Sequence, residues 1–361
     1  MTFGYAIGCA VIAYCFVAYR KSPVLKLDLF PFQLRFKHPF KIAHGVRTTT
    51  DVVYIRLTHQ NLVAWGEAAL PPYLPETQKS VIDFFSKIDI SGIQFPLNPV
   101  QIFKETDEKY SGNLSAKAAL DMALWGLKAQ IENKPIGELL KIEATQFPLC
   151  TYTLGVSSLD EMKVKVGEAN QYGFELFKVK LNGENDKQAL ENFRRLTRKP
   201  FAIDVNQGWK TADEARGNLH DLVQFDPVLV EQPLPVTGLN EMPELLKEFS
   251  VPFYADESCR QPGDIEKLPG YFNGVNIKLM KCGGISPALE MIAKARGLGL
   301  KILIGCMSES SVGCTAAAHL TPLADYADLD GPYLIVNDPF SGMTVERGRI
   351  KVNPLIQKTA F

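Results

Sequence analysis

From residue 150 onward, short apolar runs that end in polar residues alternate with stretches of helical periodicity. Eight strand-like runs follow one another: TYTLGV, LFKVKL, FAIDVN, VLVEQP, PFYADE, GVNIKL, KILIGC and YADLDG. As markers of these runs we take Thr153, Lys178, Asp204, Glu231, Asp256, Lys278, Gly305 and Asp328. The intervals between markers are 25, 26, 27, 25, 22, 27 and 23 residues, the length of a strand, a helix and two loops. The pattern predicts an α/β fold with a parallel (β/α)8 TIM barrel over residues 149–330.

An open, doubly wound sheet is the alternative to the barrel, but it usually has fewer units and often a glycine-rich phosphate loop. Neither GxGxxG nor GxxxxGK[ST] occurs in the chain. The pair Gly283-Gly284 after the sixth run is interpreted as a turn into a helix, because no Lys-Ser or Lys-Thr follows it.

The first third of the chain, residues 23–148, has the pattern of an α+β unit. Two strand-like segments, LKLDLFPFQLRF and DVVYIRL, flank HPFKIAHGVRTTT, which is interpreted as a polar loop. AWGEA resembles the end of a strand, and LPPYLPET is a proline-rich loop. A helix is predicted from Ser115, where apolar residues recur at helical spacing: Ala116, Ala119, Leu120, Ala123, Leu124, Leu127 and Ile131.

The segment 1–22 is an apolar extension. Residues Phe3 to Tyr19 are uncharged and mostly apolar, and their length is at the short limit for a membrane-spanning helix. No basic region precedes them and no AxA-like cleavage site is evident, which disfavours a secretory signal. The segment is either an anchor or a dispensable extension, and we favour the extension. Membrane association is expected only if it inserts, and Arg20 and Lys21 would then favour a cytoplasmic location for the rest.

Composition narrows the classes of function. With 361 residues, 46% of them hydrophobic, the chain can form a large core and more than one domain. Its 39 basic and 40 acidic residues give a net charge of -1 and no basic face, so we expect no nucleic-acid partner. Seven cysteines without a CxxC motif indicate a reduced, cytoplasmic compartment. A homo-oligomer is left open.

The strand ends carry the residues that indicate chemistry, because active sites of such barrels lie at the C-terminal ends of the strands. They are Lys178 and Lys180 on the second run, Asp204, Glu231, Asp256 and Lys278 on the next four, and Asp328 and Asp330 on the eighth. Three buried carboxylates side by side are costly without a cation, and oxygen ligands of this kind suit Mg²⁺. We therefore expect Asp204, Glu231 and Asp256 to bind Mg²⁺. The alternative is a network of lysine–carboxylate ion pairs without catalysis.

The expected reaction is proton transfer at a carbon next to a carboxylate. A substrate carboxylate bound to the metal loses electron density, and its neighbouring C–H bond becomes more acidic. Lys180 and Lys278 lie on opposite sides of the predicted barrel, so one amine can remove the proton and the other can return it on the other face. We expect nearby cations to lower the pKa of these lysines. The outcome is racemisation or epimerisation.

The chain resembles the enolase superfamily, in its muconate-lactonizing subgroup. The resemblance covers residues 25 to 355 and rests on five motifs in order: KVK at 178–180, DVNQGW at 204–209, EQP at 231–233, ADES at 255–258 and NIKLMKCGGIS at 276–286. It implies a modified (β/α)8 barrel beneath an α+β capping domain of residues 23–148, to which residues 331–361 return.

Within that subgroup the chain is similar to the dipeptide epimerases, through the DLD motif at 328–330. The resemblance implies that Asp328 and Asp330 bind the α-ammonium group of a dipeptide, as its charge requires. It further implies that Lys180 takes the proton from the (R) epimer and Lys278 from the (S) epimer. By the same resemblance Lys178 and Thr153 contact the substrate, and the backbone around Cys306 lines the pocket.

The choice of dipeptide depends on the capping loops. In some Ala-Glu epimerases an arginine of the first loop binds the glutamate side chain; here Gly45 stands near that place, and Arg47 or Lys41 could act instead. Leu70, Pro71, Pro72 and Tyr73 are expected to shape the pocket. L-Ala-D/L-Glu, from cell-wall peptides, is the first choice, and another Xaa-Glu or a hydrophobic dipeptide is the second. A cycloisomerase, an o-succinylbenzoate synthase and a non-catalytic dipeptide-binding protein are the alternative functions.

Overall fold

The computed structural model describes residues 25–42, 45–143, 146–353 and 356–359. The apolar segment 1–22, with its two interpretations, lies outside the described residues. Within the described ranges, no helix is both long and apolar enough to cross a membrane.

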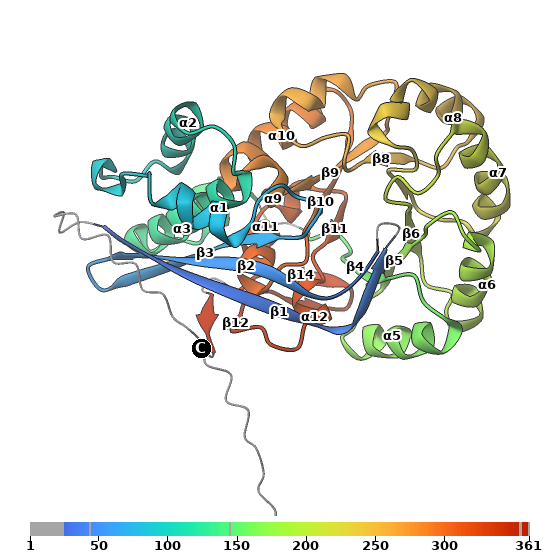
Figure 1. Ribbon diagram of the computed structural model, residues 1–361, viewed down its shortest axis with the longest axis horizontal. Helices are drawn as coiled ribbons and strands as arrows, with labels where there is room; N and C mark the ends of the chain where they lie inside the picture. Colours follow the sequence, from blue (N-terminus) through green and yellow to red (C-terminus); the bar gives the residue numbers. More distant parts are fainter. Residues whose placement is uncertain (1–24, 43–44, 144–145, 354–355, 360–361) are drawn as a thin grey trace, which may run out of the picture.

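Eight parallel strands form a closed barrel (Figure 1). In chain order they are β4 (Thr151–Leu154), β5 (Leu176–Lys180), β6 (Phe201–Asp204), β7 (Val230–Glu231), β8 (Phe253–Ala255), β9 (Gly274–Lys278), β10 (Lys301–Gly305) and β11 (Tyr326–Asp328). The barrel closes because Ala327 of β11 pairs with Cys150, just before β4, and donates its N–H to Leu149 O at 3.0 Å. Each strand falls within one of the eight strand-like runs, so the predicted barrel is confirmed.

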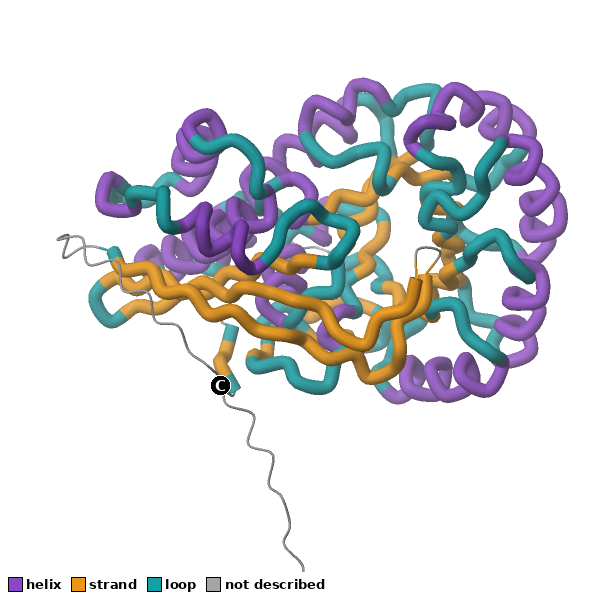
Figure 2. Tube along the Cα trace, viewed as in Figure 1, coloured by secondary structure: helices purple, strands orange, loops and turns teal. Residues whose placement is uncertain are grey.

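Helices surround the barrel as an outer ring (Figure 2). They are α5 (Leu159–Gln171), α6 (Asp186–Leu196), α7 (Ala212–Leu222), α8 (Met242–Glu248), α9 (Leu279–Cys282), α10 (Ile285–Gly297), α11 (Ser311–Ala318) and α12 (Gly331–Leu334). The repeat is imperfect in one place: between β8 and β9 the chain forms only the 3₁₀ segment η4 (Pro262–Lys267). The repeat predicted a helix in this 22-residue interval, and that prediction is wrong, because a short 3₁₀ segment takes its place.

The N-terminal unit begins with a three-stranded antiparallel sheet of β1 (Lys26–Ile42), β2 (Gly45–His59) and β3 (Leu62–Leu70). The interpretation of residues 38–50 as a polar loop is wrong, because the two strands continue through this segment. Pairing runs from Lys26↔Thr58 to Arg35↔Thr49, shifts at a bulge, and resumes at Phe40↔Arg47. The rings of Phe36 and Phe40 stack at 5.4 Å along this extension. The polar residues of this segment that the structure describes therefore lie in the two strands of a long β-hairpin.

The hairpin reaches the barrel (Figure 1). Val156, in the loop after β4, donates its N–H to Lys41 O at 3.0 Å. At Gly155 a Cβ atom would stand only 2.9 Å from Lys41 O, so this close approach requires glycine. The end of the first hairpin is thereby fixed at the rim where the chemistry was predicted.

Helices α1 (Gln78–Phe85), α2 (Pro99–Lys109), α3 (Leu114–Glu132) and α4 (Ile136–Leu139) complete the N-terminal unit. Helix α3 confirms the helix predicted from Ser115. Asn113 is its N-cap and accepts a hydrogen bond from Ala116 N at 3.2 Å. Small alanine side chains on α3 let the helix pack closely on β3, and both elements contribute to one hydrophobic cluster.

The C-terminal segment contains β12 (Phe340–Ser341), β13 (Thr344–Glu346), β14 (Arg349–Lys351) and β15 (Gln357–Lys358). Part of it lies against the N-terminal sheet: Arg35 N donates to Asn337 Oδ1 at 2.7 Å. The ring of Phe340 packs edge-on against Tyr54 and Trp65, at 4.9 and 5.0 Å. These contacts are those of a tail that returns to the cap, while the boundaries at 148 and 330 stay a prediction.

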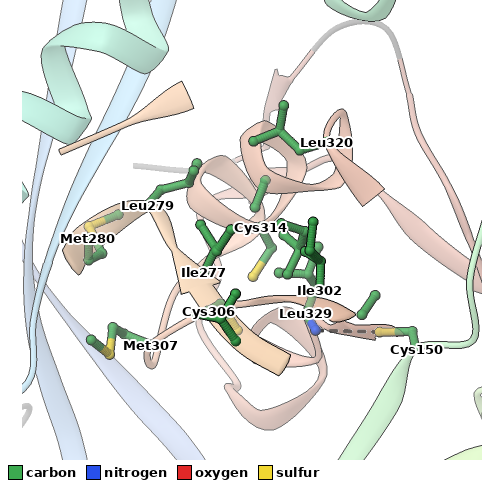
Figure 3. Close-up of a cluster of buried hydrophobic side chains, with 14 of the residues drawn as sticks. Cys150, Ile277, Leu279, Met280, Ile302, Cys306, Met307, Cys314, Leu320 and Leu329 are labelled. Atoms are coloured by element: carbon green, nitrogen blue, oxygen red, sulfur yellow. Dashed lines mark hydrogen bonds between the residues drawn. The ribbon is translucent and has the colours of Figure 1, made fainter. Parts of the chain in front are cut away.

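Apolar side chains and thiols fill the space between the later strands and their helices (Figure 3). Ile277 of β9 and Ile302 of β10 are fully buried there, beside Cys314 of α11. Leu329 N donates to Cys150 Sγ at 3.4 Å, which ties the end of β11 to the start of the barrel. The five cysteines in the described part of the chain are all free thiols, as the absence of a cysteine motif predicts.

Candidate active site

A cavity of about 300 Å³ opens at the C-terminal ends of the barrel strands. Its volume lies within the range of small-molecule sites. Most of the residues predicted to act there line it: Thr153, Lys178, Lys180, Asp256, Lys278, Cys306, Asp328 and Asp330. Asp204 and Glu231 lie beneath this surface, with no exposed area. Phe36, Phe40 and Tyr73 of the N-terminal unit close the cavity from the other side.

The position of Lys178 is set by strand pairing. Lys178 pairs with Thr153 of β4, while Asp204 at the end of β6 pairs with both Lys180 and Glu231. The Lys178 ammonium nitrogen lies 2.9 Å from Asp204 Oδ2, 2.9 Å from Glu231 Oε2 and 2.7 Å from Asp328 Oδ2. One cation thus touches carboxylates from three strands.

Lys180 and Lys278 approach the cavity from opposite walls. They end β5 and β9, which are four positions apart in a closed ring of eight strands. Lys180 Nζ donates to Asp204 Oδ2 at 2.6 Å and to Asn206 Oδ1 at 2.8 Å. Lys278 Nζ donates to Asp256 Oδ2 at 2.7 Å. Both amines therefore border one common cavity, as two-sided proton transfer requires.

Lys281 is a further buried cation that sequence reasoning missed. Its Nζ donates to Asp256 Oδ1 and Asp256 O, both at 2.6 Å, and to Asn276 O at 2.9 Å. The signal was present in NIKLMKC, where Lys281 follows Lys278 by three residues, one turn along α9. Asp256 consequently has two lysine partners.

The two aspartates of the eighth strand have different partners. Asp328 accepts hydrogen bonds from Lys178 and from Thr151 Oγ1, the latter at 2.5 Å. Asp330 accepts from Thr153 N at 2.5 Å, and no lysine of the described ranges forms a hydrogen bond with it. Burial and the charge of Asp328 raise the pKa of Asp330 to about 7. Of the two aspartates, only Asp328 is in hydrogen-bond contact with an ammonium group among the described residues.

The carboxylates at the ends of β6 and β7 differ in their affinity for protons. Burial opposes ionisation of Asp204, but the ammonium groups of Lys178 and Lys180 lower its pKa to about 2. Burial and the charge of Asp204 raise the pKa of Glu231 to about 8. A proton or a further cation is therefore needed to keep both groups buried.

Lysine pKa values differ from the sequence-based expectation. Burial lowers the pKa of Lys278, but the carboxylate of Asp256 outweighs it and raises the pKa above the usual range. The pKa of Lys178 is likewise raised by Asp204 and Asp328, against the effect of burial. The ammonium group of Lys178 does lower the pKa of Lys278, as expected of a nearby cation, but the carboxylate of Asp256 outweighs both this effect and burial.

The donor set has the chemistry of a divalent cation site. Asp204 and Glu231 both reach one cationic atom, Lys178 Nζ, and Glu231 Oε2 does so without hydrogen-bond geometry. No three His, Cys, Asp or Glu side chains in the described ranges converge closely enough to surround a metal ion by themselves. Lysine amines take up the carboxylate oxygens instead. The residues fit Mg²⁺ in type, number and burial, and Lys178 would have to yield its contacts for them to converge.

Arg47 lies behind the aromatic wall of the cavity. Its guanidinium carbon is 5.6, 5.8 and 5.5 Å from the ring centres of Phe36, Phe40 and Tyr73. Arg47 Nη2 donates to Ser308 Oγ at 3.4 Å, and Nη1 is buried without a hydrogen-bond partner. A buried guanidinium with a free donor is a site for an anionic or polar group.

The other predictions about residues of the capping loops have different outcomes. Tyr73 lines the cavity, whereas Leu70, Pro71 and Pro72 are not among its lining residues in the described ranges, so their expected role stays a prediction. Lys41, the alternative to Arg47, points to the outside and pairs with Glu161 at 3.7 Å. Sequence reasoning also missed three lining residues that follow the third and fifth strands, Asn206, Glu257 and Arg260.

Comparisons with known proteins agree with this fold and site. Residues 27–141 match the model of the mandelate racemase / muconate lactonizing enzyme N-terminal domain, and residues 161–351 match the enolase C-terminal domain-like model. An L-Ala-D/L-Glu epimerase of Bacteroides thetaiotaomicron is 37% identical over 92% of this chain and 86% of its own. A hydrophobic dipeptide epimerase of Roseobacter litoralis is 33% identical over 90% and 95%.

A solved structure extends the comparison. The dipeptide epimerase of Enterococcus faecalis, complexed with Mg and L-Leu-L-Tyr, superimposes with a TM-score of 0.82 and is 27% identical, covering 92% of this chain and 97% of its own. The chain belongs to the mandelate racemase / muconate lactonizing enzyme family of the enolase superfamily. Within this superfamily its sequence relatives include L-Ala-D/L-Glu and hydrophobic dipeptide epimerases, which confirms the predicted resemblance.

Proposed function

We propose that this protein is a magnesium-dependent dipeptide epimerase, an isomerase that inverts the α-carbon of the C-terminal residue. The observation that carries the proposal is the pair Lys180 and Lys278, on opposite walls of one cavity and beside three buried carboxylates. The epimerase relatives, and a related structure complexed with Mg and a dipeptide, support it.

Asp204, Glu231 and Asp256 would hold the Mg²⁺. When bound, the cation withdraws electron density from a substrate carboxylate and so acidifies the neighbouring C–H bond. Lys180 faces the substrate from the β5 wall and removes the α-proton of the (R) epimer. Lys278 faces it from the β9 wall and removes that of the (S) epimer. The amine on the opposite face, protonated beforehand, delivers its proton there, and the amine that removed the first proton keeps it, so the configuration inverts.

Asp328 and Asp330 would bind the α-ammonium group of the dipeptide. Asp330 has no lysine partner, and a substrate ammonium would supply the missing charge. Thr153 holds Asp330 through its backbone N–H, and Lys178 holds Asp328, so the pair is fixed before substrate arrives. A cycloisomerase or o-succinylbenzoate synthase substrate has no ammonium group and would leave Asp330 without a counterion.

Arg47 is proposed to select the side chain of the residue that is inverted. Its buried Nη1 lacks a partner and would bind a glutamate carboxylate near Ser308. L-Ala-D/L-Glu is therefore the first choice of substrate, in salvage of cell-wall peptides. The aromatic wall around Arg47 would suit a hydrophobic side chain, which is the second choice. We propose a cytoplasmic location, because all five described cysteines are free.

The proposal is tested with a dipeptide library in heavy water with Mg²⁺, read by mass for deuterium gain at the α-carbon. The wild-type protein should exchange both epimers of its substrate. Lys180→Ala should lose exchange of the (R) epimer only, and Lys278→Ala that of the (S) epimer only. Lys165→Met, a change of a buried lysine on α5 away from the cavity, should alter neither.

Two results would reject the proposal. One is dipeptide binding with magnesium but no α-proton exchange, which would favour the non-catalytic binding protein. The other is equal loss of exchange for both epimers in each lysine variant while Mg²⁺ binding is unchanged. Candidate acids without an ammonium group belong in the same library, because their turnover would favour the cycloisomerase alternative.

A further inference from the structure

One wall of the cavity is held by two buried glutamates from different parts of the chain. Cys306, Met307 and Ser308, between β10 and α11, line the cavity. Glu309 follows directly, and Glu67 comes from β3 of the N-terminal sheet. The two glutamates are 1% and 0% exposed, and neither lines the cavity itself.

Glu67 binds the first turn of α11. Its Oε1 accepts from Ser310 N at 2.9 Å, and its Oε2 accepts from Ser310 Oγ at 2.6 Å and from Gly313 N at 2.9 Å. Ser310 is the N-cap residue of this helix. A carboxylate here satisfies N–H groups that the helix leaves unpaired and faces the positive end of its dipole. A capping strand thereby fixes the start of a barrel helix.

Glu309 holds the wall itself. Its Oε1 accepts from Met307 N at 2.6 Å, while its Oε2 is buried with no hydrogen-bond partner in the described part of the chain. A Cβ atom placed on Gly313 would lie 2.2 Å from Glu309 Oε2 and 3.2 Å from Glu67 Oε2. The two carboxyl groups therefore meet at this glycine, and only glycine leaves them room.

Two buried carboxyl groups this near to each other cannot both ionise without cost. Burial and the charge of Glu67 raise the pKa of Glu309 to about 8, and burial raises the pKa of Glu67 to about 7. Lys278 favours the charge of Glu309, and Asp338 opposes that of Glu67. The other titratable groups that face the pair are Tyr54, Cys306 and Cys314, and each has its pKa raised chiefly through burial or through the pair's charge.

We propose that Glu67 and Glu309 are positioning residues, one of which stays protonated, and that together they fix the Met307–Ser308 wall against the capping sheet. Removal of that proton places two charges at Gly313 and loosens the wall. Substrate binding then weakens, while the lysine chemistry on the other strands is unchanged. The effect on substrate rests on the proposed function; the effect on the wall does not.

The test separates KM from kcat across pH. For the wild-type protein, KM for its dipeptide should rise about tenfold between pH 7 and pH 9.5, with kcat within about twofold. Glu309→Gln keeps an acceptor for Met307 N but cannot lose a proton, so its KM should rise clearly less than that of the wild-type protein, by only the part that Asp330, Glu231 and the substrate ammonium contribute in both proteins. Glu309→Ala should raise KM about tenfold at every pH, because the wall loses its buried hydrogen bond.

Asp121→Asn is the matched control. Asp121 is a buried carboxylate of α3 that likewise binds the start of a barrel helix, at Ser286 N of α10, but it does not line the cavity. This variant should keep the wild-type rise of KM. Thermal unfolding of each variant reports whether it is folded.

Amide hydrogen exchange of residues 306–313 in the substrate-free protein tests the wall independently of any activity. After correction for intrinsic rates, protection should fall between pH 6.5 and pH 9 in the wild-type protein and stay constant in Glu309→Gln. The proposal is overturned if that variant shows the wild-type rise of KM, or if wild-type protection is the same at both pH values. If no dipeptide is turned over but protection still changes in this way, the proposed function fails and the positioning pair stands.

Discussion

Replacement of Lys178 by methionine should expose how the buried charges are balanced. The Lys178 ammonium touches Asp204, Glu231 and Asp328 within 2.9 Å, and the three carboxylates are 7% exposed at most. The three carboxylates do not depend equally on the Lys178 ammonium group. Asp204 keeps Lys180, and Glu231, with a pKa of about 8, holds a proton at pH 7. The variant therefore leaves one carboxylate, that of Asp328, buried without a cation.

Removal of one partner of a buried ion pair costs about 3–5 kcal/mol, so the free energy of unfolding should fall by that amount. Mg²⁺ present at one hundred times its dissociation constant should raise the variant's free energy of unfolding by about 2.7 kcal/mol. The variant should bind Mg²⁺ at least as tightly as the wild-type protein, because Lys178 no longer competes for Asp204 and Glu231 and only Lys180 still contacts Asp204. Urea denaturation with and without Mg²⁺ measures both quantities.

Lys117→Met is the control. Lys117 is as buried as Lys178, but Asp107, whose carboxylate lies 2.6 Å from its ammonium nitrogen, is half exposed and would remain hydrated. Its loss should be smaller and should not depend on Mg²⁺. If Lys178→Met costs no more than Lys117→Met, the three contacts of Lys178 contribute little, and the charge balance argued above is wrong.

Three further predictions concern specificity and stability. Arg47→Lys should lower kcat/KM for Ala-Glu about tenfold or more and leave kcat/KM for hydrophobic dipeptides unchanged, because an ammonium cannot reproduce the guanidinium's paired donors. Arg56→Lys, also at an arginine stacked on aromatic rings, should change kcat/KM for neither class of dipeptide. Burial lowers the pKa of His319 to about 4, so the native state binds fewer protons than the unfolded state below pH 6.5, and stability should fall as pH drops from 6.5 to 4. His319→Leu should remove about 3 kcal/mol of that dependence, measured by denaturation at each pH. Gly284→Ala, at φ +135° with a carboxylate oxygen 2.5 Å from the new Cβ, should destabilise by about 2–4 kcal/mol in urea denaturation, whereas Gly297→Ala, in open space on the same helix, should stabilise by about 0.5–1 kcal/mol.

The barrel was predictable because its signal is local and repeated. Each unit contains one apolar run of strand length, and the polar residue at its end marks the same rim every time. The pairing of Asp204 with Glu231 across β6 and β7 follows directly from that repetition. Between Asp256 and Lys278 the interval of 22 residues is close to the others in length, so the sequence pattern did not reveal that a 3₁₀ segment replaces the helix there.

The long hairpin and the aromatic contacts of Arg47 could not be predicted from the sequence in the same way. Residues 38–50 are largely polar, and the strand conformation of 38–42 and 45–50 depends on which residue of the other strand each one pairs with, such as Phe40 opposite Arg47. A polar segment predicts a loop unless its partner is known. Likewise, Tyr73 approaches Arg47 only because the proline-rich loop folds over the hairpin, a contact between residues far apart in sequence.

The raised pKa of Lys278 connects metal binding with proton abstraction in the proposed reaction. Lys278 donates to Asp256 at 2.7 Å, and this carboxylate holds the amine protonated. A protonated amine cannot abstract a proton, so Asp256 must exchange Lys278 for another cation before this base can act. Lys180 also contacts a proposed metal ligand, Asp204 at 2.6 Å, so bound Mg²⁺ would compete with this amine for the carboxylate. Chelation of divalent ions should therefore stop deuterium exchange of both epimers together, unlike either single lysine variant, which stops one. Continued exchange of one epimer in the chelator would show that its lysine is free of its carboxylate without a metal, and the link would be refuted.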